Sequence, residues 1–196
     1  MAAPLLASKR LLLRHWSARD LQALALMNSD PEVMRYAPDT MSSDQSEIFC
    51  AAIQIGLEVR DYGLWAIELL GNVSQVHGPF IGFAGLAVPT WQVSPEPSYE
   101  IGWRLNRSYW GSGYATEAAA RVLDYAFFEM QLKQVFASAP VLNTRSTAVM
   151  ERLQMWRQAP DFDHPAFSSG HKMRRHAHFS ITASRWSEVR EMVFVN

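Results

Sequence analysis

The sequence is poor in cysteine, in net charge and in long apolar runs. Cys50 is the only cysteine among 196 residues, so the chain cannot form an internal disulfide or a cysteine-based zinc site. A net charge of −1 lacks the broad basic field that nucleic acid or an anionic membrane requires. No stretch approaches the ~20 apolar residues of a membrane helix, and residues 1–8 lack a signal-peptide pattern. We therefore expect a soluble cytoplasmic protein without a nucleic-acid or membrane partner, as a monomer or a homodimer.

The composition is that of a globular protein with a substantial core. Hydrophobic residues make up 48% of the chain and charged residues 19%. The length suits one domain, and no linker, repeat or low-complexity tract divides it, so residues 1–196 are predicted to form a single α/β domain. Cys50 lies in an apolar run and reads as a small buried helix residue rather than a catalytic thiol.

The hydrophobic pattern predicts alternating strands and helices. Strands are predicted at 9–16, 63–70, 79–88, 99–105, 134–139 and 176–182. Helices are predicted after Ser17, from Pro31, from Ser42, and at 115–130 and 143–154. The helix after Ser42 should be capped by Gln45 and should bury a stripe of five residues: Ile48, Phe49, Ala52, Ile55 and Val59. Gly71-Asn72 is a turn signal, and 89–97 is a proline-containing loop.

A strand, a Gly-Ser-Gly turn and a helix follow one another at residues 99–130. Small residues at 111–113 let successive backbone N–H groups converge, and the helix N-terminus behind them favours an anion. A tight strand-to-helix turn without a ligand fits the glycine spacing equally well. A P-loop is disfavoured because the turn contains no lysine, and a dinucleotide fold because the turn follows four predicted strands.

The residues around this turn resemble the GNAT N-acetyltransferases, in particular the RimJ/RimL-like branch. The resemblance is carried by Tyr99-Glu100-Ile101-Gly102-Trp103 and Trp110-Gly111-Ser112-Gly113-Tyr114-Ala115-Thr116, and it extends from residue 9 to about 185. It implies the GNAT fold, an α/β (α+β) architecture with a mixed, mostly antiparallel twisted sheet of about seven strands and helices on both faces. It also implies an acyltransferase that moves an acetyl group from acetyl-CoA to a primary amine of a protein N-terminus or a small molecule.

The resemblance assigns cofactor contacts to three segments. The pyrophosphate of CoA is expected on the turn, at Gly111, Ser112, Gly113, Tyr114, Ala115 and Thr116. The pantetheine arm is expected along the main chain of Trp103, Arg104 and Leu105, in the manner of an added strand. Asn143 and Ser146, at the start of the next helix, are expected near the thioester.

The resemblance also suggests catalytic residues, each with a structural alternative. Glu100 is the candidate general base, or else a strand glutamate paired with Arg104. Ser146 is the candidate hydrogen-bond donor to the leaving sulfur, or else a helix-capping serine. His164 and His176 are expected to line the acceptor pocket or to bond within the C-terminal hairpin, and His176 to assist proton transfer.

Other features leave the function partly open. The four histidines between 164 and 178 have no standard ligand spacing, so no metal is expected. Gln154 stands where the family usually has glycine at a left-handed helix end, and should shift or strain it. Residues 176–179 lack the tyrosine that relatives carry. A non-catalytic acyl-CoA sensor is therefore the alternative to the enzyme, and the acceptor is not predicted.

Overall fold

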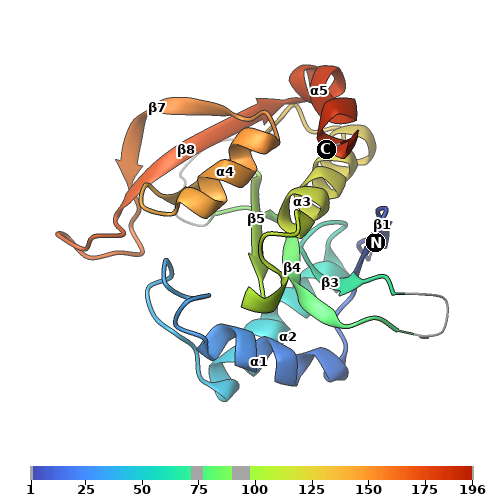
Figure 1. Ribbon diagram of the computed structural model, residues 1–196, viewed down its shortest axis with the longest axis vertical. Coiled ribbons are helices and arrows are strands. Elements are labelled where there is room, and N and C mark those ends of the chain that lie inside the picture. Colours follow the sequence, from blue (N-terminus) through green and yellow to red (C-terminus); the bar gives the residue numbers. More distant parts are fainter. Residues whose placement is uncertain (1, 72–76, 90–97, 196) are drawn as a thin grey trace.

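The computed structural model describes residues 2–71, 77–89 and 98–195 (Figure 1). All described strands join one sheet in the order β1-β2-β3-β4-β5-β6-β8-β7. Every neighbouring pair is antiparallel except β5 and β6, which run parallel. The strands are β1 Leu6–Ala7, β2 Leu11–Arg14, β3 Leu64–Leu69, β4 Phe80–Ala87, β5 Glu100–Leu105, β6 Gln134–Pro140, β7 Trp156–Asp163 and β8 Arg175–Thr182. This is the predicted mixed, mostly antiparallel α/β architecture, with eight strands rather than about seven.

The helices cover both faces of the sheet. They are α1 Leu21–Ser29, α2 Ser43–Val59, α3 Tyr114–Asp124, α4 Thr144–Arg152 and α5 Ala183–Val195, with short turns η1 Ala18–Asp20, η2 Arg107–Tyr109 and the π-type η3 Tyr125–Glu129. Phe83 of β4 contacts Phe49 of α2, so α1 and α2 cover the face that Phe83 occupies. The alanine-rich stripe of α3 packs on β4 and β5 from the other side, as its spacing predicted.

All six predicted strands are present, with ends that differ by at most three residues. Two strands and one helix were not predicted. β1 has only two residues, and β7 is an exposed edge strand interrupted by Pro160, so neither shows the apolar alternation of a buried strand. Helix α5 did carry a readable signal, because Trp186 and Val189 are three residues apart and fully buried.

The predicted buried stripe of α2 is wrong. Ile48, Ile55 and Val59 are 71%, 58% and 67% exposed, and Ala52 is exposed as well. The buried side of the helix carries Ser46, Cys50, Gly56 and Leu57 instead, with Phe49 and Ile53 half-buried beside them. Both stripes have helical spacing, and the more polar one faces inward because Ser46 bonds to a buried partner on α1.

The helix predicted from Pro31 is also wrong. Residues 31–39 form turns, with a single α-type bond from the Met34 N–H to the Asp30 carbonyl. The capping box of α2 is confirmed, because Ser42 and Gln45 exchange side-chain and backbone hydrogen bonds. Asn72 and residues 90–97 lie outside the described residues, so the turn and most of the loop predicted there go undescribed.

Gln154 adopts a strained left-handed backbone conformation at the end of α4, and the helix end is not shifted. It adopts φ +59°, in the left-handed region that glycine usually occupies. The Gln154 and Met155 N–H groups donate to the carbonyls of Glu151 and Met150, which is the Schellman pattern. The helix therefore ends as it would with glycine at this position.

Cys50 is a core residue, as predicted. It is 3% exposed, and burial together with the charge of Asp20 raises the pKa of its thiol to about 11. Such a thiol stays protonated at neutral pH and is a poor nucleophile. Within the described parts of the chain, no helix is both long and apolar enough to cross a membrane.

Candidate active site

Strands β5 and β6 separate soon after they meet. Their only paired residues are Glu100 and Phe136, and the Phe136 N–H donates to the Tyr99 carbonyl. Beyond this point β6 stays paired with β8 over its whole length, while β5 stays with β4. The wedge between them opens into a cleft of about 1390 Å³, lined by β5, the 109–117 turn, the end of β6 and helix α4 (Figure 1). The parallel pair thus positions the site.

The Gly-Ser-Gly turn has the geometry of an anion cradle. Gly111 and Gly113 have φ values of +79° and +80°, which side chains disfavour, and Gly113 is the N-cap of α3. The first backbone bond of α3 runs from the Glu117 N–H to the Gly113 carbonyl. The N–H groups at positions 113–116 precede it and have no partner within the helix. They lie at the rim of the cleft with the positive end of the helix dipole.

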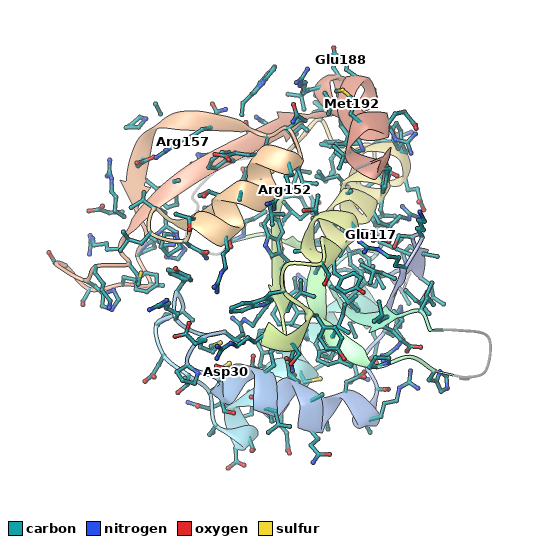
Figure 2. All side chains as sticks on the ribbon, viewed as in Figure 1. Asp30, Glu117, Arg152, Arg157, Glu188 and Met192 are labelled. Atoms are coloured by element: carbon teal, nitrogen blue, oxygen red, sulfur yellow. The ribbon has the colours of Figure 1, made fainter. Side chains whose placement is uncertain are left out.

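The surroundings of the turn also suit a phosphate. The Thr116 hydroxyl is buried without a hydrogen-bond partner among the described residues. Arg10 donates to the Ser112 carbonyl at 3.0 Å and is held by an ion pair of 2.6 Å to Glu117. Arg145 and Arg152 of α4 also line the cleft, and Figure 2 shows Arg152 on α4 and Glu117 on α3. A buried unpaired hydroxyl and a basic rim are what a bound pyrophosphate would use.

The wedge leaves one edge of β5 open. The Tyr99 carbonyl points toward β6. Because the main-chain groups of every second strand residue point to the same side, those of Ile101 and Trp103 also point toward β6. The Leu105 carbonyl, also on that side, accepts from the Trp110 indole at 2.9 Å. Arg104 turns its main chain toward β4. The open edge therefore favours Ile101 and Trp103 for an extended ligand, and Ile101 was not among the predicted residues.

Helix α4 forms the wall opposite β5. The Asn143 side chain caps this helix by accepting from the Ser146 N–H at 3.2 Å, so Asn143 and not Ser146 is the N-cap. Both residues line the cleft. Ser146 lies on the first turn of α4.

Glu100 is half-buried at the apex of the wedge. It accepts a hydrogen bond of 2.5 Å from Ser138 of β6, whose side chain lines the cleft. Burial raises the pKa of the Glu100 carboxyl above its ordinary value, and the bond from Ser138 offsets part of that rise. No ion pair joins Glu100 to Arg104 among the described residues, so the predicted salt-bridge alternative is absent there. A carboxylate with a raised pKa beside a cleft suits general-base chemistry.

Arg104 lies on the same face of β5 as Glu100 and lines the cleft. Its guanidinium donates to Asn28 of α1 at 2.8 Å and lies 5.2 Å from the ring of Phe83. Asn28 is fully buried and donates in turn to Ser46 of α2. Burial lowers the pKa of Arg104 to about 10. Arg104 is thus held by neutral groups, namely the amide of Asn28, which Ser46 supports from behind, and the ring of Phe83.

The histidines form an aromatic wall beside β6. The rings of His164 and His176 are 4.6 Å apart, and both residues line the cleft. His176 is bonded through Nδ1 to the Arg174 carbonyl, and burial lowers the pKa of both histidines. His178 lies opposite Ser138 in the sheet, and its Nε2 is buried without a partner in the described structure. Across residues 2–71, 77–89 and 98–195, no three His, Cys, Asp or Glu side chains group as metal ligands do.

Sequence reasoning missed the residues that act through tertiary contacts. Ser138 shows only as a polar residue in an apolar strand, which is a weak signal for a partner of Glu100. Asn28 and Ser46 are ordinary helix residues in the sequence, and nothing there predicts that they meet. Ile101 was in the recognised segment, and the parity of β5 could have identified it.

Comparisons with known proteins agree with this geometry. The family described as Acetyltransferase (GNAT) domain matches residues 10–155. The uncharacterized N-acetyltransferase YnaD of Bacillus subtilis is 27% identical over 185 residues, covering 93% of this chain and 99% of that protein. FsC-acetyl coenzyme A-N(2)-transacetylase of Aspergillus fumigatus is 29% identical over 157 residues, covering 76% of this chain and 63% of that protein. The crystal structure of a GNAT-family acetyltransferase from Bacillus anthracis superposes with a TM-score of 0.76 at 26% identity, covering 92% and 99% of the two chains.

The family match spans more than half of the chain, and the sheet that opens between β5 and β6 is the fold that the structural relatives share. The chain carries the glycine turn at the N-terminus of α3 and a cleft beside it. An acyl group is what proteins of this family transfer. The chain therefore belongs to the GNAT family of N-acetyltransferases and is an acyltransferase.

Proposed function

We propose that this protein transfers the acetyl group of acetyl-CoA to a primary amine by direct attack, with Glu100 as the general base. The observation that carries the proposal is the continuous cleft that joins the Gly-Ser-Gly turn to Ser138, the hydrogen-bond partner of Glu100. The name of the Aspergillus transacetylase supports the choice of acetyl-CoA. Acetyl-CoA supplies the thioester; the chain supplies binding, orientation and proton transfer.

The residues divide this work between two ends of the cleft. At the turn, the N–H groups at 113–116 and the Thr116 hydroxyl hold the pyrophosphate, and Arg10, Arg145 and Arg152 supply positive charge around it. Along β5, the main chain of Ile101 and Trp103 holds the pantetheine as an added strand would. We therefore expect the reacting end of an extended ligand to lie toward the apex of the wedge.

At the apex, proton transfer falls to Glu100 and its neighbours. An alkyl amine is mostly protonated at pH 7, so it must lose a proton before it attacks. Glu100 accepts that proton either directly or through the Ser138 hydroxyl, which already bridges to the cleft. Ser146 of α4 donates to the departing sulfur, and His176, which lines the same cleft, assists proton transfer.

The structure removes the main ground for a non-catalytic sensor. That alternative depended on Gln154 distorting α4, and the helix end keeps the glycine-like conformation. The base candidate is also in place beside the cleft. We propose further that residues 1–196 act as one domain, with its core at 9–185, and that the RimJ/RimL-like resemblance identifies the branch.

Substitution at Gly113 tests the cofactor site. Gly113→Asp places a carboxylate where the pyrophosphate is expected, and should abolish measurable CoA binding in a calorimetric titration. Gly113→Asn is the matched control, because asparagine has a similar size, tolerates left-handed φ and carries no charge. It should bind CoA with a much smaller loss. Equal CoA affinity in the two variants would refute the pyrophosphate assignment.

A further inference from the structure

Arg104 is a half-buried cation without a counter-ion in the described structure. Among residues 2–71, 77–89 and 98–195, no carboxylate forms an ion pair with it, and its bonded partner is the amide oxygen of Asn28. Burial is the sole cause that lowers the pKa of this guanidinium to about 10. A desolvated charge without a partner is costly, so proteins usually pair it. Arg104 also lines the cleft, which makes its remaining N–H groups available to a ligand.

The position of Arg104 is held from behind. Asn28 is 0% exposed, its oxygen accepts from Arg104 at 2.8 Å, and its nitrogen donates to Ser46 at 3.2 Å. The Phe83 ring supports the guanidinium on the same side. Arg104 is therefore a preorganised donor, so little side-chain freedom would be lost when an anion binds.

The space beside Arg104 is open at Gly102. Glu100, Gly102 and Arg104 alternate onto one face of β5, and the two charged residues are about 13 Å apart between Cα atoms. Gly102 lies between them, lines the cleft, and a Cβ added to it would meet no atom within 4 Å. One face of the strand thus offers a base, then an open slot, then a fixed cation.

We infer that Arg104 binds a carboxylate of the acceptor, so that the substrate is a small primary amine whose carboxylate is separated from the amine by several carbons, such as a γ-amino acid. This inference rests on the proposed function and deepens it. The amine lies toward Glu100 and the carboxylate toward Arg104, with the body of the acceptor over Gly102. The rings of His164, Phe167 and His176 form another wall of the cleft, so we use an acceptor with an aromatic side chain as the first probe.

The test compares matched acceptors in two proteins. The kcat/KM for 4-amino-3-phenylbutyrate is divided by that for its amide, and the same is done for 4-aminobutyrate and its amide. Each quotient is measured for the wild type and for Arg104→Met, so the intrinsic reactivity of each amine cancels. We expect the quotient of at least one pair to fall by about 10- to 100-fold in the variant, as for loss of a charge-assisted hydrogen bond. Arg104→Lys should retain part of the preference.

Arg35→Met is the control for loss of a positive charge near the cleft. Arg35 is 55% exposed and paired with Glu32, which lines the cleft, so its removal should leave both quotients unchanged. Calorimetric binding of 4-amino-3-phenylbutyrate and of its amide in the presence of CoA gives a readout that does not need turnover. If the acid binds more tightly than its amide, and if this preference is lost in Arg104→Met, the inference is supported even without acetylation. Absence of acetylation would refute the proposed function instead.

Two outcomes would overturn the inference. In one, the quotients of both pairs are the same in Arg104→Met and in the wild type while amines are acetylated, so Arg104 does not recognise a carboxylate. In the other, Arg104→Met raises the KM for acetyl-CoA and leaves both quotients unchanged, so the cation serves a phosphate of the cofactor.

Discussion

Two arginines of this protein, Arg14 in the buried interior and Arg104 half-buried at the cleft, differ in the charge of their surroundings. Arg14 of β2 bonds both carboxylate oxygens of Asp20, at 2.7 and 2.8 Å, and also pairs with Glu68 of β3. Arg104 of β5 bonds one neutral amide and lies over a ring. The first cation is neutralised by the protein itself, whereas the second is held in place and left uncompensated.

The carboxylates of the two regions differ in the same way. Burial would raise the pKa values of Asp20 and Glu68, but the Arg14 guanidinium and backbone N–H donors outweigh it and lower both. Burial raises the pKa of Glu100, because only the hydroxyl and the backbone N–H of Ser138 oppose it and no cation among the described residues does. The ion pairs of Arg14 with Asp20 and Glu68 stabilise the β2–β3 side of the fold. Glu100 and Arg104 of β5 are not paired with each other in the described structure, so they remain available for proton transfer and for a ligand.

The largest expected effect is on kcat, and it distinguishes Glu100 of β5 from Glu68 of β3. Glu100→Gln should lower kcat by about 10²- to 10⁴-fold, since a positioned general base contributes that much. CoA affinity should be unchanged, and stability at pH 7 should not fall, because the variant removes an ionised carboxylate that burial disfavours. Steady-state thiol release and urea unfolding check these points. Normal turnover in Glu100→Gln would exclude this residue as the base.

Glu68→Gln is the counterpart in the paired region. It breaks ion pairs with Arg14 and Arg19 and should cost stability, with little direct effect on kcat. If Glu68→Gln were as stable as the wild type, the contrast between a structural and a functional carboxylate would fail.

The two arginines should differ in stability when replaced. Arg14→Met leaves Asp20 and Glu68 buried without their cation and should cost about 3–5 kcal/mol of unfolding free energy. Arg104→Met leaves the Asn28 oxygen unpaired, which costs about 1–3 kcal/mol, but it also removes a desolvated charge. Its net loss should therefore be the smaller one. Urea midpoints give both values, and equal losses would show that Arg104 is structural.

The pH dependence of stability should have opposite signs in the two regions. The folded pKa values of Asp20 and Glu68 are lowered, so their contribution is complete above the unfolded values of about 3.9–4.3 and is lost as the pH falls through the folded ones. The folded pKa of Glu100 is raised, so its contribution is lost as the pH rises from about 4.3 through that value. Urea unfolding between pH 3 and 7 should therefore show a decline that Glu100→Gln removes, and an acid loss that persists in that variant.

The smallest effect concerns the hydrogen bond to Glu100. Ser138 stabilises the carboxylate, so Ser138→Ala should raise the pKa of Glu100 further. The base must be ionised to accept a proton, so the acid limb of the kcat/KM profile should move to higher pH. A profile measured from pH 5 to 9 decides this, and an acid limb that stays in place would separate Ser138 from the titration of the base.

Much of the site was predicted because its parts are local in sequence. The turn at 111–113 needs left-handed φ values that glycine favours, and both glycines have them. The alternation of β5 placed Glu100 and Arg104 on one face, and the apolar spacing of α3 placed its stripe in the core. The glycine spacing alone did not distinguish an anion site from a plain turn. The family resemblance supplied the expectation that these segments bind acetyl-CoA.

The remaining parts depend on where distant segments meet. Ser138 reaches Glu100 across 38 positions, and Asn28 reaches Arg104 across 76, and no spacing rule encodes either contact. The buried side of α2 was mispredicted for the same reason, because the contact between Ser46 and Asn28 decided it and not the apolar pattern.

The sequence by itself determined the elements and the conformation of the glycine turn, because hydrophobic period and backbone sterics act within a few residues. Only the tertiary structure decided which charges are paired. The Arg14 network closes between β2 and β3, whereas β5 separates from β6 and leaves Arg104 facing the cleft. Pairing depends on which strands stay together, and strand pairing is a property of the whole sheet.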